Sequence, residues 1–363
     1  MTITLERQAG RRKAGPREAG PRQAGPLRER YARIKAENPK ARIRNVAQQM
    51  SVSELELVAA NCGDIQSTLL REPAQDIFKQ LGSLGRVMAL TRNDWCVHER
   101  HGKYEDIRAG KTMGIVLGPD IDLRVFFSEW KSAWAVSDGG RLSIQFFDAA
   151  GGAIHKVYVT GETDADAYHA LVRQFADPHP AWPAIIPLQA ARDDTLPQAP
   201  AQLRADWLAM EDTHQFHGLL KRHNVSRLAA LRGAGADLAQ ELSNDTAERM
   251  LRDVAARDIP FMCFVGNRGM IQIHTGPVRK LMRTGPWFNV LEPHFNLHLD
   301  TTAIVSTWIV NKPTVDGWVT SVECYAGNGE LIAQFFGARK PGVPELADWR
   351  NLLAGYCPVP LAA

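Results

Sequence analysis

Two histidines three residues apart, His214 and His217, are the side chains in this chain whose type and spacing most suggest chemistry. The surrounding sequence predicts a helix, and residues three apart on a helix project from one face. A neutral imidazole is the commonest metal ligand in proteins. The pair alone is weak evidence, because surface and capping histidines are frequent, so its surroundings must decide its role.

The sequence around the pair argues against a metal held by protein ligands alone. There is no HExxH motif, and no set of cysteines or carboxylates near His214 suits zinc. If a metal is bound, one axial imidazole to a haem fits better. Haem propionates need cations, and the candidates are Arg222, Arg227, Arg232 and Lys312. We expect solvated helix faces for Arg222 and Arg232, whereas Arg227 could return across the same pocket from the next helix.

Length and composition describe an ordinary globular protein. The 363 residues suffice for two domains, and hydrophobic and charged residues make up 45% and 23%. No apolar run approaches the roughly eighteen residues that span a bilayer. The N-terminus lacks the apolar core of a secretory signal, so we expect a cytoplasmic protein that is not membrane-embedded. Five scattered cysteines without a CxxC pair argue against a disulfide framework.

An internal repeat organises the chain. Residues 116–123 and 132–136 recur as 290–297 and 306–310 at a constant offset of 174 residues, and residues 141–148 parallel 318–325. The chain is therefore a tandem duplication, with one repeat at 27–176 and the other at 203–363. The first copy has no histidine where the second has His214 and His217.

Two segments lie outside the repeats. Residues 1–26 repeat an Arg-x-Ala-Gly-Pro unit, which predicts a disordered basic tail. Arg11, Arg12 and Lys13 could contact nucleic acid, but a solvated tail is favoured and no nucleic-acid partner is expected. Residues 177–202 are rich in proline and predict a semi-rigid linker.

Each repeat predicts the same order of elements. Helices come first, over residues 27–70 and 203–254, and a closing helix is expected at 164–175 and 345–355. Short strands with turn signals lie between, for example at 87–90, 95–99, 114–116, 121–127 and 142–147. Helices and strands in separate blocks indicate an α+β fold with antiparallel sheets. Trp134 and Trp308 occupy equivalent positions and are expected in the core.

Long motifs in both repeats resemble the HemS-like family of cytoplasmic haemin-transport and haemin-degrading proteins of Gram-negative bacteria. The resemblance covers residues 27–357. The motifs that carry it are residues 89–99, 121–126, 287–298, 308–321 and 336–342. It implies two similar α+β halves, each a large antiparallel sheet flanked by helices, and one haem b held in the C-terminal half.

The resemblance also implies roles for individual residues. The axial haem ligand falls on His214, and His217 stands where some members have a second ligand. The propionate-binding cations fall on Arg227 and Lys312. A catalytic arginine that reaches the opposite haem face from the first half falls on Arg124. Pocket-lining positions fall on Phe264, Gln334 and Arg339, and Phe336 stands near a position where some members have tyrosine.

Two functions remain open from these residues. The first is a haem-degrading enzyme that frees iron, with electrons from an external donor and with Arg124 stabilising negative charge on a reduced oxygen ligand. The second is a carrier that takes haem from an inner-membrane importer to a haem oxygenase. In that case His217 would allow haem to shift stepwise during transfer.

Overall fold

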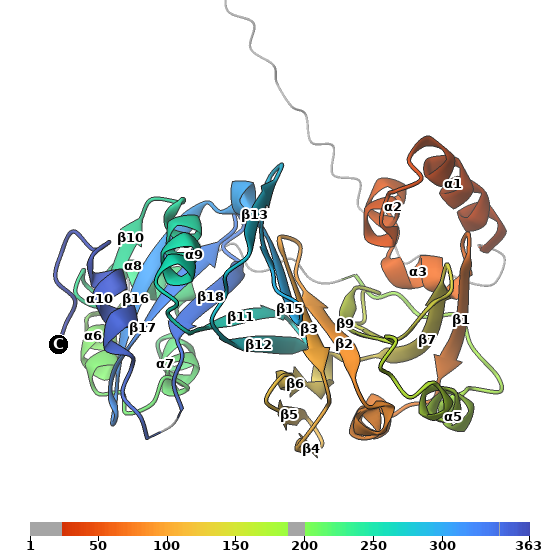
Figure 1. Cartoon of the computed structure of the whole chain (residues 1–363), viewed down its shortest axis with the longest axis horizontal. Helices are drawn as coiled ribbons and strands as arrows, with labels where there is room; N and C mark the ends of the chain where they lie inside the picture. Colours follow the sequence, from red (N-terminus) through yellow and green to blue (C-terminus); the bar gives the residue numbers. More distant parts are fainter. Residues whose placement is uncertain (1–23, 188–199, 341) are drawn as a thin grey trace, which may run out of the picture.

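The computed structural model describes residues 24–187, 200–340 and 342–363 (Figure 1). Most of the predicted tail, including Arg11, Arg12 and Lys13, and the centre of the predicted linker therefore lie outside the described residues. Helix α1 (Ala24–Glu37) begins within the last residues assigned to the tail. Among the described residues, no helix has the length and apolar character to cross a membrane.

Two antiparallel sheets of nine strands each form the body of the protein, which confirms the predicted α+β class. The first sheet has the order β1 (Ile65–Leu70), β7 (Ser132–Asp138), β8 (Arg141–Phe147), β9 (Ala153–Tyr158), β2 (Val87–Arg92), β3 (Cys96–Gly102), β15 (Phe295–Asp300), β14 (Trp287–Leu291) and β13 (Leu281–Thr284). The second has the order β10 (Ala239–Leu242), β16 (Ser306–Thr314), β17 (Gly317–Tyr325), β18 (Leu331–Gly337), β11 (Phe261–Asn267), β12 (Met270–Gly276), β6 (Asp122–Phe126), β5 (Met113–Leu117) and β4 (Ile107–Ala109).

Each sheet takes three strands from the other copy of the repeat. Strands β4, β5 and β6 of the first copy extend the second sheet, and β13, β14 and β15 of the second copy extend the first. The exchanged segments follow β3 and β12, which end at Gly102 and Gly276. Gly102 is required to be small, because a Cβ there would overlap the Asp120 side chain. The two copies are consequently interlocked in one body.

Two equivalent asparagines join the sheets where they cross. Asn93 donates from Nδ2 to one carbonyl of β11 at 3.1 Å and one of β18 at 2.8 Å. Asn267, 174 residues later, donates to one carbonyl of β2 at 3.0 Å and one of β9 at 2.8 Å. Satisfying backbone carbonyls of both sheets fixes their relative position.

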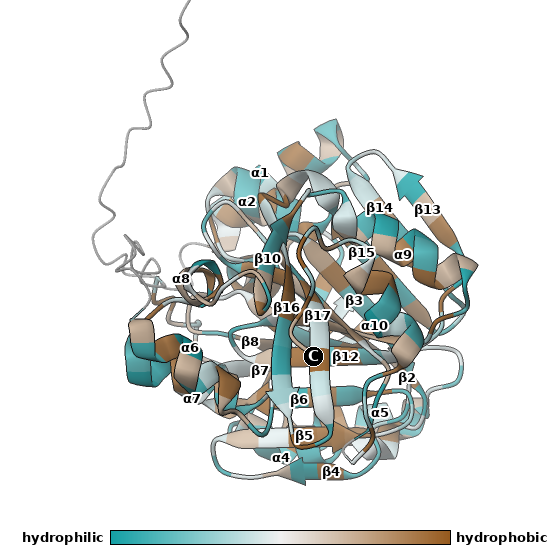
Figure 2. Ribbon diagram, turned by 90° about the vertical axis from the view of Figure 1, so that its left-hand side faces the viewer, coloured by the Kyte–Doolittle hydropathy of each residue, from teal (hydrophilic) through white to brown (hydrophobic). Residues whose placement is uncertain are grey.

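Helices cover both faces of the sheets. On one face, α2 (Ile43–Met50) and α3 (Glu54–Ala59) pack at the β1 end of the first sheet, and α6 (Ala201–Leu208), α7 (Gln215–His223) and α8 (Arg227–Gly233) pack at the β10 end of the second. Figure 2 shows hydrophobic and hydrophilic residues on both α6 and α7. The opposite faces are covered by α4 (Ala74–Lys79), α5 (Ala165–Phe175), α9 (Thr246–Ala256) and α10 (Ala347–Ala354). Trp134 and Trp308 are buried under the helices of the first face, as expected for core residues.

Two details of the sequence-based prediction are wrong. The helical blocks 27–70 and 203–254 each contain a strand, β1 and β10, which pair with the first strands after the exchanged segments. The pairing of 141–148 with 318–325 is out by one residue, because Gln145 lies opposite Trp134 and Glu323 opposite Trp308. The correct offset there is 178 residues, and a one-residue slip would have put each side chain on the wrong face.

Candidate functional site

His214 lies immediately before α7 as its N-terminal cap, with 89% of its side chain exposed. Its Nδ1 is 2.6 Å from Oδ1 of Asp212, which also accepts the backbone N–H of His214 at 2.7 Å. A carboxylate on Nδ1 favours the tautomer in which Nδ1 carries the proton. The Nε2 lone pair is then free to bind a metal atom.

His217 lies one turn further along α7 and is also exposed. The helix is held in place from its other side, where Phe216 and Leu219 are buried. The ring of Phe216 packs edge-on against that of Trp207, with centroids 4.6 Å apart. The two imidazoles therefore project from a helix whose position is fixed by the core.

A buried carboxylate, Glu323 on β17, gathers the two predicted propionate-binding cations. Arg227, the first residue of α8, places Nε 2.7 Å and Nη2 2.5 Å from the two oxygens of Glu323. Nζ of Lys312 on β16 lies 3.1 Å from one of them. Both cations also lie beside the ring of Phe216, at 4.9 Å and 4.8 Å from its centroid. The cations thus lie directly beneath the helix that carries the histidines.

The charges of this cluster do not cancel. Burial alone would raise the pKa of Glu323, but Arg227 and Lys312 hold it well below its ordinary value. Burial, together with the nearby Arg227, lowers the pKa of Lys312 to about 8, so Lys312 is mostly protonated at neutral pH. Two cations and one carboxylate leave an excess positive charge in a place with little water, where an anionic group is favoured.

The register of the second sheet places four predicted residues on the same face as Glu323. Opposite residues in antiparallel strands share a face, which links Glu323 to Gln334 and Gln334 to Phe264. Nε2 of Gln334 donates to Glu323 at 2.9 Å. Phe264 packs against Phe336 at 4.9 Å between ring centroids, and both rings are partly exposed. Lys312 lies on β16 four residues after Trp308, the partner of Glu323, and therefore on the same face. Phe264 and Phe336 supply an apolar surface on this face.

Arg124 reaches this face by strand exchange. It lies on β6, opposite Ile271 on β12, two residues from the partner of Phe264. Its guanidinium pairs with Asp122 and donates to the carbonyl of Leu123, and a third of the side chain is exposed. A residue of the first copy is thereby placed on the same sheet face as the cluster of the second.

Arg339 lies apart from Glu323. Its Nη2 is 3.2 Å from Oδ2 of Asp316 in the turn between β16 and β17. The pKa of Asp212 is lowered, chiefly by the backbone N–H of His214, with a smaller contribution from Arg339. Arg339 therefore lies on the same side of the site as the start of α7.

Sequence reasoning missed three members of this site. Glu323 orders the cations, Tyr325 bonds to both Glu323 and Arg227, and Phe216 packs against both cations. A carboxylate within the buried strand β17 is the signal that was available, because such a residue is almost never buried unless paired. Phe216 gave no signal, since an aromatic residue on the inner face of a helix is ordinarily core.

The duplicated α+β fold, with a histidine-bearing helix above a cationic and apolar sheet face, defines a class of ligand-binding proteins. The chain matches the haemin-degrading HemS.ChuX domain over residues 51–175 and 224–356. It belongs to the HemS family.

Relatives and solved structures agree with this assignment. The hemin transport protein HmuS of Yersinia pestis is 40% identical over 333 residues, which cover 90% of this chain and 96% of the relative. The structure of apo-PhuS, a heme-binding protein from Pseudomonas aeruginosa, is similar with a TM-score of 0.86 and 42% identity, covering 92% of this chain and 99% of that one. The heme degrading enzyme ChuS of Escherichia coli O157:H7 has a TM-score of 0.86 and 34% identity, covering 92% and 100%.

Proposed function

We propose that this protein binds one haem b through His214 in the cytoplasm and degrades it, so that its iron becomes available. The observation that carries the proposal is the exposed His214, whose Nδ1 is held by Asp212 and whose Nε2 is free, at the start of a helix that packs over the paired cations. The similarity to a heme degrading enzyme, ChuS, and to a heme-binding protein, PhuS, supports it.

The residues on this face fit the chemical groups of haem. His214 would bind the iron, Arg227 and Lys312 would meet the propionates, and Phe264 would line a porphyrin face. Gln334 and Arg339 would contribute polar contacts at the edges of the pocket. Haem, when bound, would supply the iron at which dioxygen is reduced, with electrons from an external donor.

Arg124 is the residue that we assign to catalysis. Its side chain is one third exposed, and its pairing with Asp122 restricts the orientation of the guanidinium. Fixed hydrogen-bond donors stabilise charge that develops on a reacting oxygen at little reorganisation cost. Arg124 would donate hydrogen bonds to a water or an oxygen atom at the bound haem.

A carrier function is the alternative, and the position of His217 favours it. A second exposed imidazole one turn from His214 would allow haem to move from one ligand to the next as it passes from an importer to a haem oxygenase. The similarity to the hemin transport protein HmuS is compatible with this function.

One experiment separates the two functions. The haem complex is incubated with a reductant in the presence of catalase, and the products are followed by absorption and mass spectrometry. Formation of a linear tetrapyrrole with catalase present supports the enzyme. Unchanged haem, or bleaching that catalase abolishes, contradicts enzymatic turnover and leaves the carrier.

A further inference from the structure

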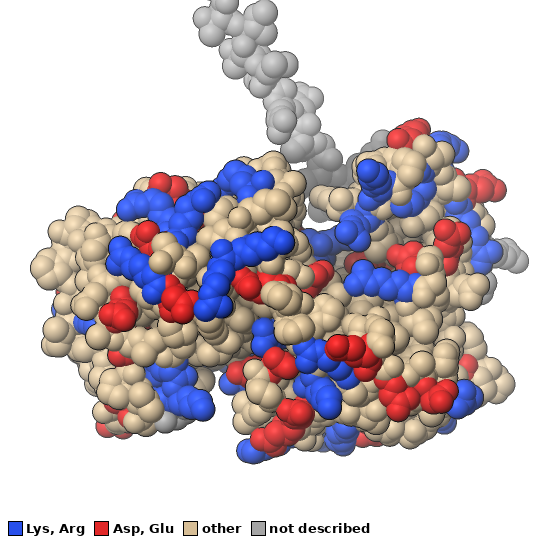
Figure 3. Space-filling view, viewed as in Figure 1, with Lys and Arg blue, Asp and Glu red and all other residues tan. Residues whose placement is uncertain are grey.

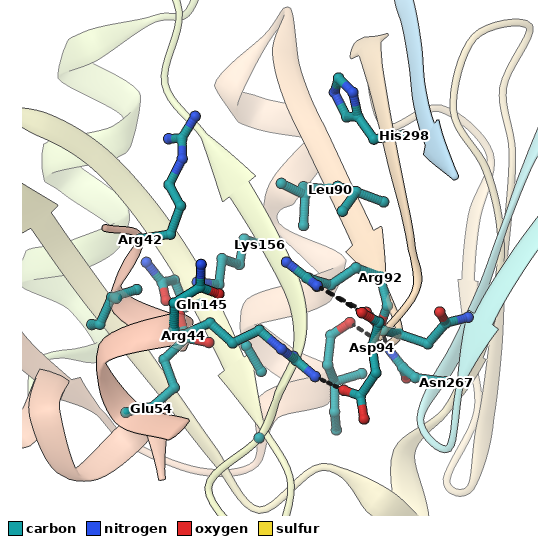
Figure 4. Close-up of a pocket in the computed structure, with 18 of the residues that line it drawn as sticks. Arg42, Arg44, Glu54, Leu90, Arg92, Asp94, Gln145, Lys156, Asn267 and His298 are labelled. Carbon is teal, nitrogen blue, oxygen red and sulfur yellow. Dashed lines mark hydrogen bonds and ion pairs between the residues drawn. The ribbon is translucent and has the colours of Figure 1, made fainter. Parts of the chain in front are cut away.

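A cavity of about 2180 Å³ lies on the face of the first sheet that corresponds to the candidate haem face of the second (Figure 4). Strands β2, β3, β8, β9, β13, β14 and β15 of the first sheet line it, and the start of α2 and of α3 lies over it. The cavity also reaches β11, β12 and β18 of the second sheet, where Phe264 and Gln334 line it, so it adjoins the candidate haem face. Ligand pockets commonly measure roughly 300 to 1,000 Å³, so the space accommodates a large ligand together with water. The residues that argue for a ligand are Arg42, Arg44, Arg92, Gln145, Lys156 and His298.

The cavity reverses the placement of imidazole and guanidinium seen in the second copy. Arg42 precedes α2 as its N-terminal cap, as His214 precedes α7, and the two helices end at the left-handed residues Ser51 and Asn224, 173 positions apart. At this offset Arg44 is the equivalent of His217. His298 on β15 lies 174 residues after Arg124 and at the equivalent position of the exchanged strands. The helix that offers imidazoles in one copy therefore offers guanidinium groups in the other.

Two ion pairs within the cavity neutralise themselves. Glu54, the first residue of α3, pairs with Lys156 on β9, and both side chains are buried. Glu54 occupies the position that Arg227 occupies in α8, directly after a capping serine. Arg44 pairs with Asp94, as Figure 4 also shows. Neither pair leaves a net charge for a ligand.

Four other guanidinium groups at the cavity, those of Arg42, Arg92, Arg141 and Arg268, lack a carboxylate partner among the residues that the structure describes. Arg141 lies over the ring of Tyr158, 4.0 Å from its centroid. Arg42 makes no side-chain hydrogen bond or ion pair with them, and Arg92 donates to two backbone carbonyls, those of Asn93 at 2.9 Å and Asp94 at 3.4 Å. Burial and the nearby Arg44 lower the pKa of Arg92 to about 10. Figure 4 shows Arg42 and Arg92 extending from α2 and from β2 on different sides of the cavity.

Further polar atoms of the cavity are available to a ligand. Gln145 is 4% exposed, and its Oε1 has no hydrogen-bond partner within the described part of the chain. His298 binds Asn289 through Nδ1 at 2.6 Å, which leaves Nε2 free, and Glu99 is the acidic group that faces it from β3. Acidic and basic side chains are interspersed on the surface drawn in Figure 3.

Apolar side chains also line the cavity between these polar groups. Leu90, Val97, Ile154 and Ile271 line the cavity, and the rings of Trp95 and Trp287 lie at it as well. A compact anion such as phosphate would satisfy one guanidinium and leave this surface in water. A ligand with two separated carboxylates on an extended apolar body would satisfy two guanidinium groups and bury the walls.

We propose that the first-copy cavity binds a dicarboxylate with an extended apolar body, held by Arg42 and Arg92. A linear tetrapyrrole has this chemistry and, resting on the proposed function, would be the ring-opened product of the second-copy site. The protein would then hold its product on the same scaffold that holds its substrate.

Biliverdin is the probe for this proposal. The full chain is first saturated with one equivalent of haem, and biliverdin binding is then measured by calorimetry. We expect binding that Arg42→Ala and Arg92→Ala each weaken by about tenfold, since each removes a charge-assisted contact. Arg33→Ala removes a charge from an exposed site on α1 and is the matched control, with unchanged affinity expected.

The remaining outcomes separate this proposal from the proposed function. Biliverdin binding that depends on Arg227 and not on Arg42 or Arg92 overturns the first-copy site. Displacement of biliverdin by millimolar inorganic phosphate also overturns it, because a compact anion would then suffice. The Soret band of the preloaded haem reports folding and the second-copy site in every variant. A protein that fails to bind haem but binds biliverdin through Arg42 and Arg92 contradicts the proposed function and supports the first-copy site.

Discussion

Helix α7 of the second copy carries His214 and His217 above a sheet face where Arg124 stands opposite, whereas α2 of the first copy carries Arg42 and Arg44 above a face where His298 stands opposite. The buried pairs beneath them are also exchanged. The helix supplies the cation Arg227 in one copy and the anion Glu54 in the other. A duplicated scaffold can thus keep its backbone while the ligand preference of each face changes through a few charged positions.

The largest effect that tests this comparison is expected for His214→Ala. Removal of the imidazole held by Asp212 should abolish or strongly shift the Soret band of the haem complex, and His217→Ala should change it less. His223→Ala is the matched control on the same helix, because Nε2 of His223 is already bound to Asp206 at 2.8 Å. An unchanged Soret band in His214→Ala would refute the assignment of the axial ligand.

Removing the helix residue of each buried ion pair should lower the free energy of unfolding by different amounts. Glu54→Ala leaves Lys156 without a carboxylate, which we expect to lower the free energy of unfolding by about 3 to 5 kcal/mol. Arg227→Ala should cost less, because Lys312, Tyr325 and Gln334 remain on Glu323. Urea denaturation measures both, and equal losses would show that the remaining partners of Glu323 contribute nothing. Arg227→Ala should in addition weaken haem affinity without moving the Soret band.

Acid should destabilise the folded protein through three buried histidines. Burial depresses the pKa of His98 well below its ordinary value and that of His155 and His274 to about 3. Their contribution to stability is complete above the unfolded pKa of about 6.5 and is lost as the pH falls below it. Each histidine should cost about 2 kcal/mol at pH 5 relative to neutral pH.

The equivalent position of the second copy provides the control for that prediction. Gln272, 174 residues after His98, is buried and donates to the carbonyl of Ala89 at 3.1 Å. His98→Gln should therefore reduce the dependence of urea stability on pH between 5 and 7. A variant with the full pH dependence of the parent would show that His98 does not titrate on unfolding.

The smallest expected effect concerns Lys312. Because its pKa is lowered to about 8, the lysine loses its positive charge as the pH rises from 7 to 9. Haem affinity should fall severalfold over this range, and Lys312→Met should have a lower affinity at pH 7 with little further change. Haem titration at both pH values measures this, and a parent affinity that stays constant would exclude a role for the lysine charge.

The sequence alone determined the repeat, the antiparallel α+β class and the chemical character of α7. These features are local, because hydrophobic alternation, turn residues and the spacing of His214 and His217 depend on neighbours along the chain. The burial of Trp134 and Trp308 also followed from their equivalent positions. Strand ends were predicted to within a few residues, as for β8, whereas β1 and β10 were missed inside blocks of helix.

The tertiary structure alone decided which side chains meet. Exchange of β4–β6 and β13–β15 carries Arg124 and His298 onto the sheets of the opposite copies, and no periodicity within a strand specifies its partner in another copy. Glu323 acquires its role because α8 places Arg227 over β17, a contact between residues 96 positions apart. The one-residue difference in repeat offset, which sets the face of Gln145 and Glu323, became visible only in the strand register. Contacts of this kind depend on packing between distant segments, which the order of residues along the chain does not express.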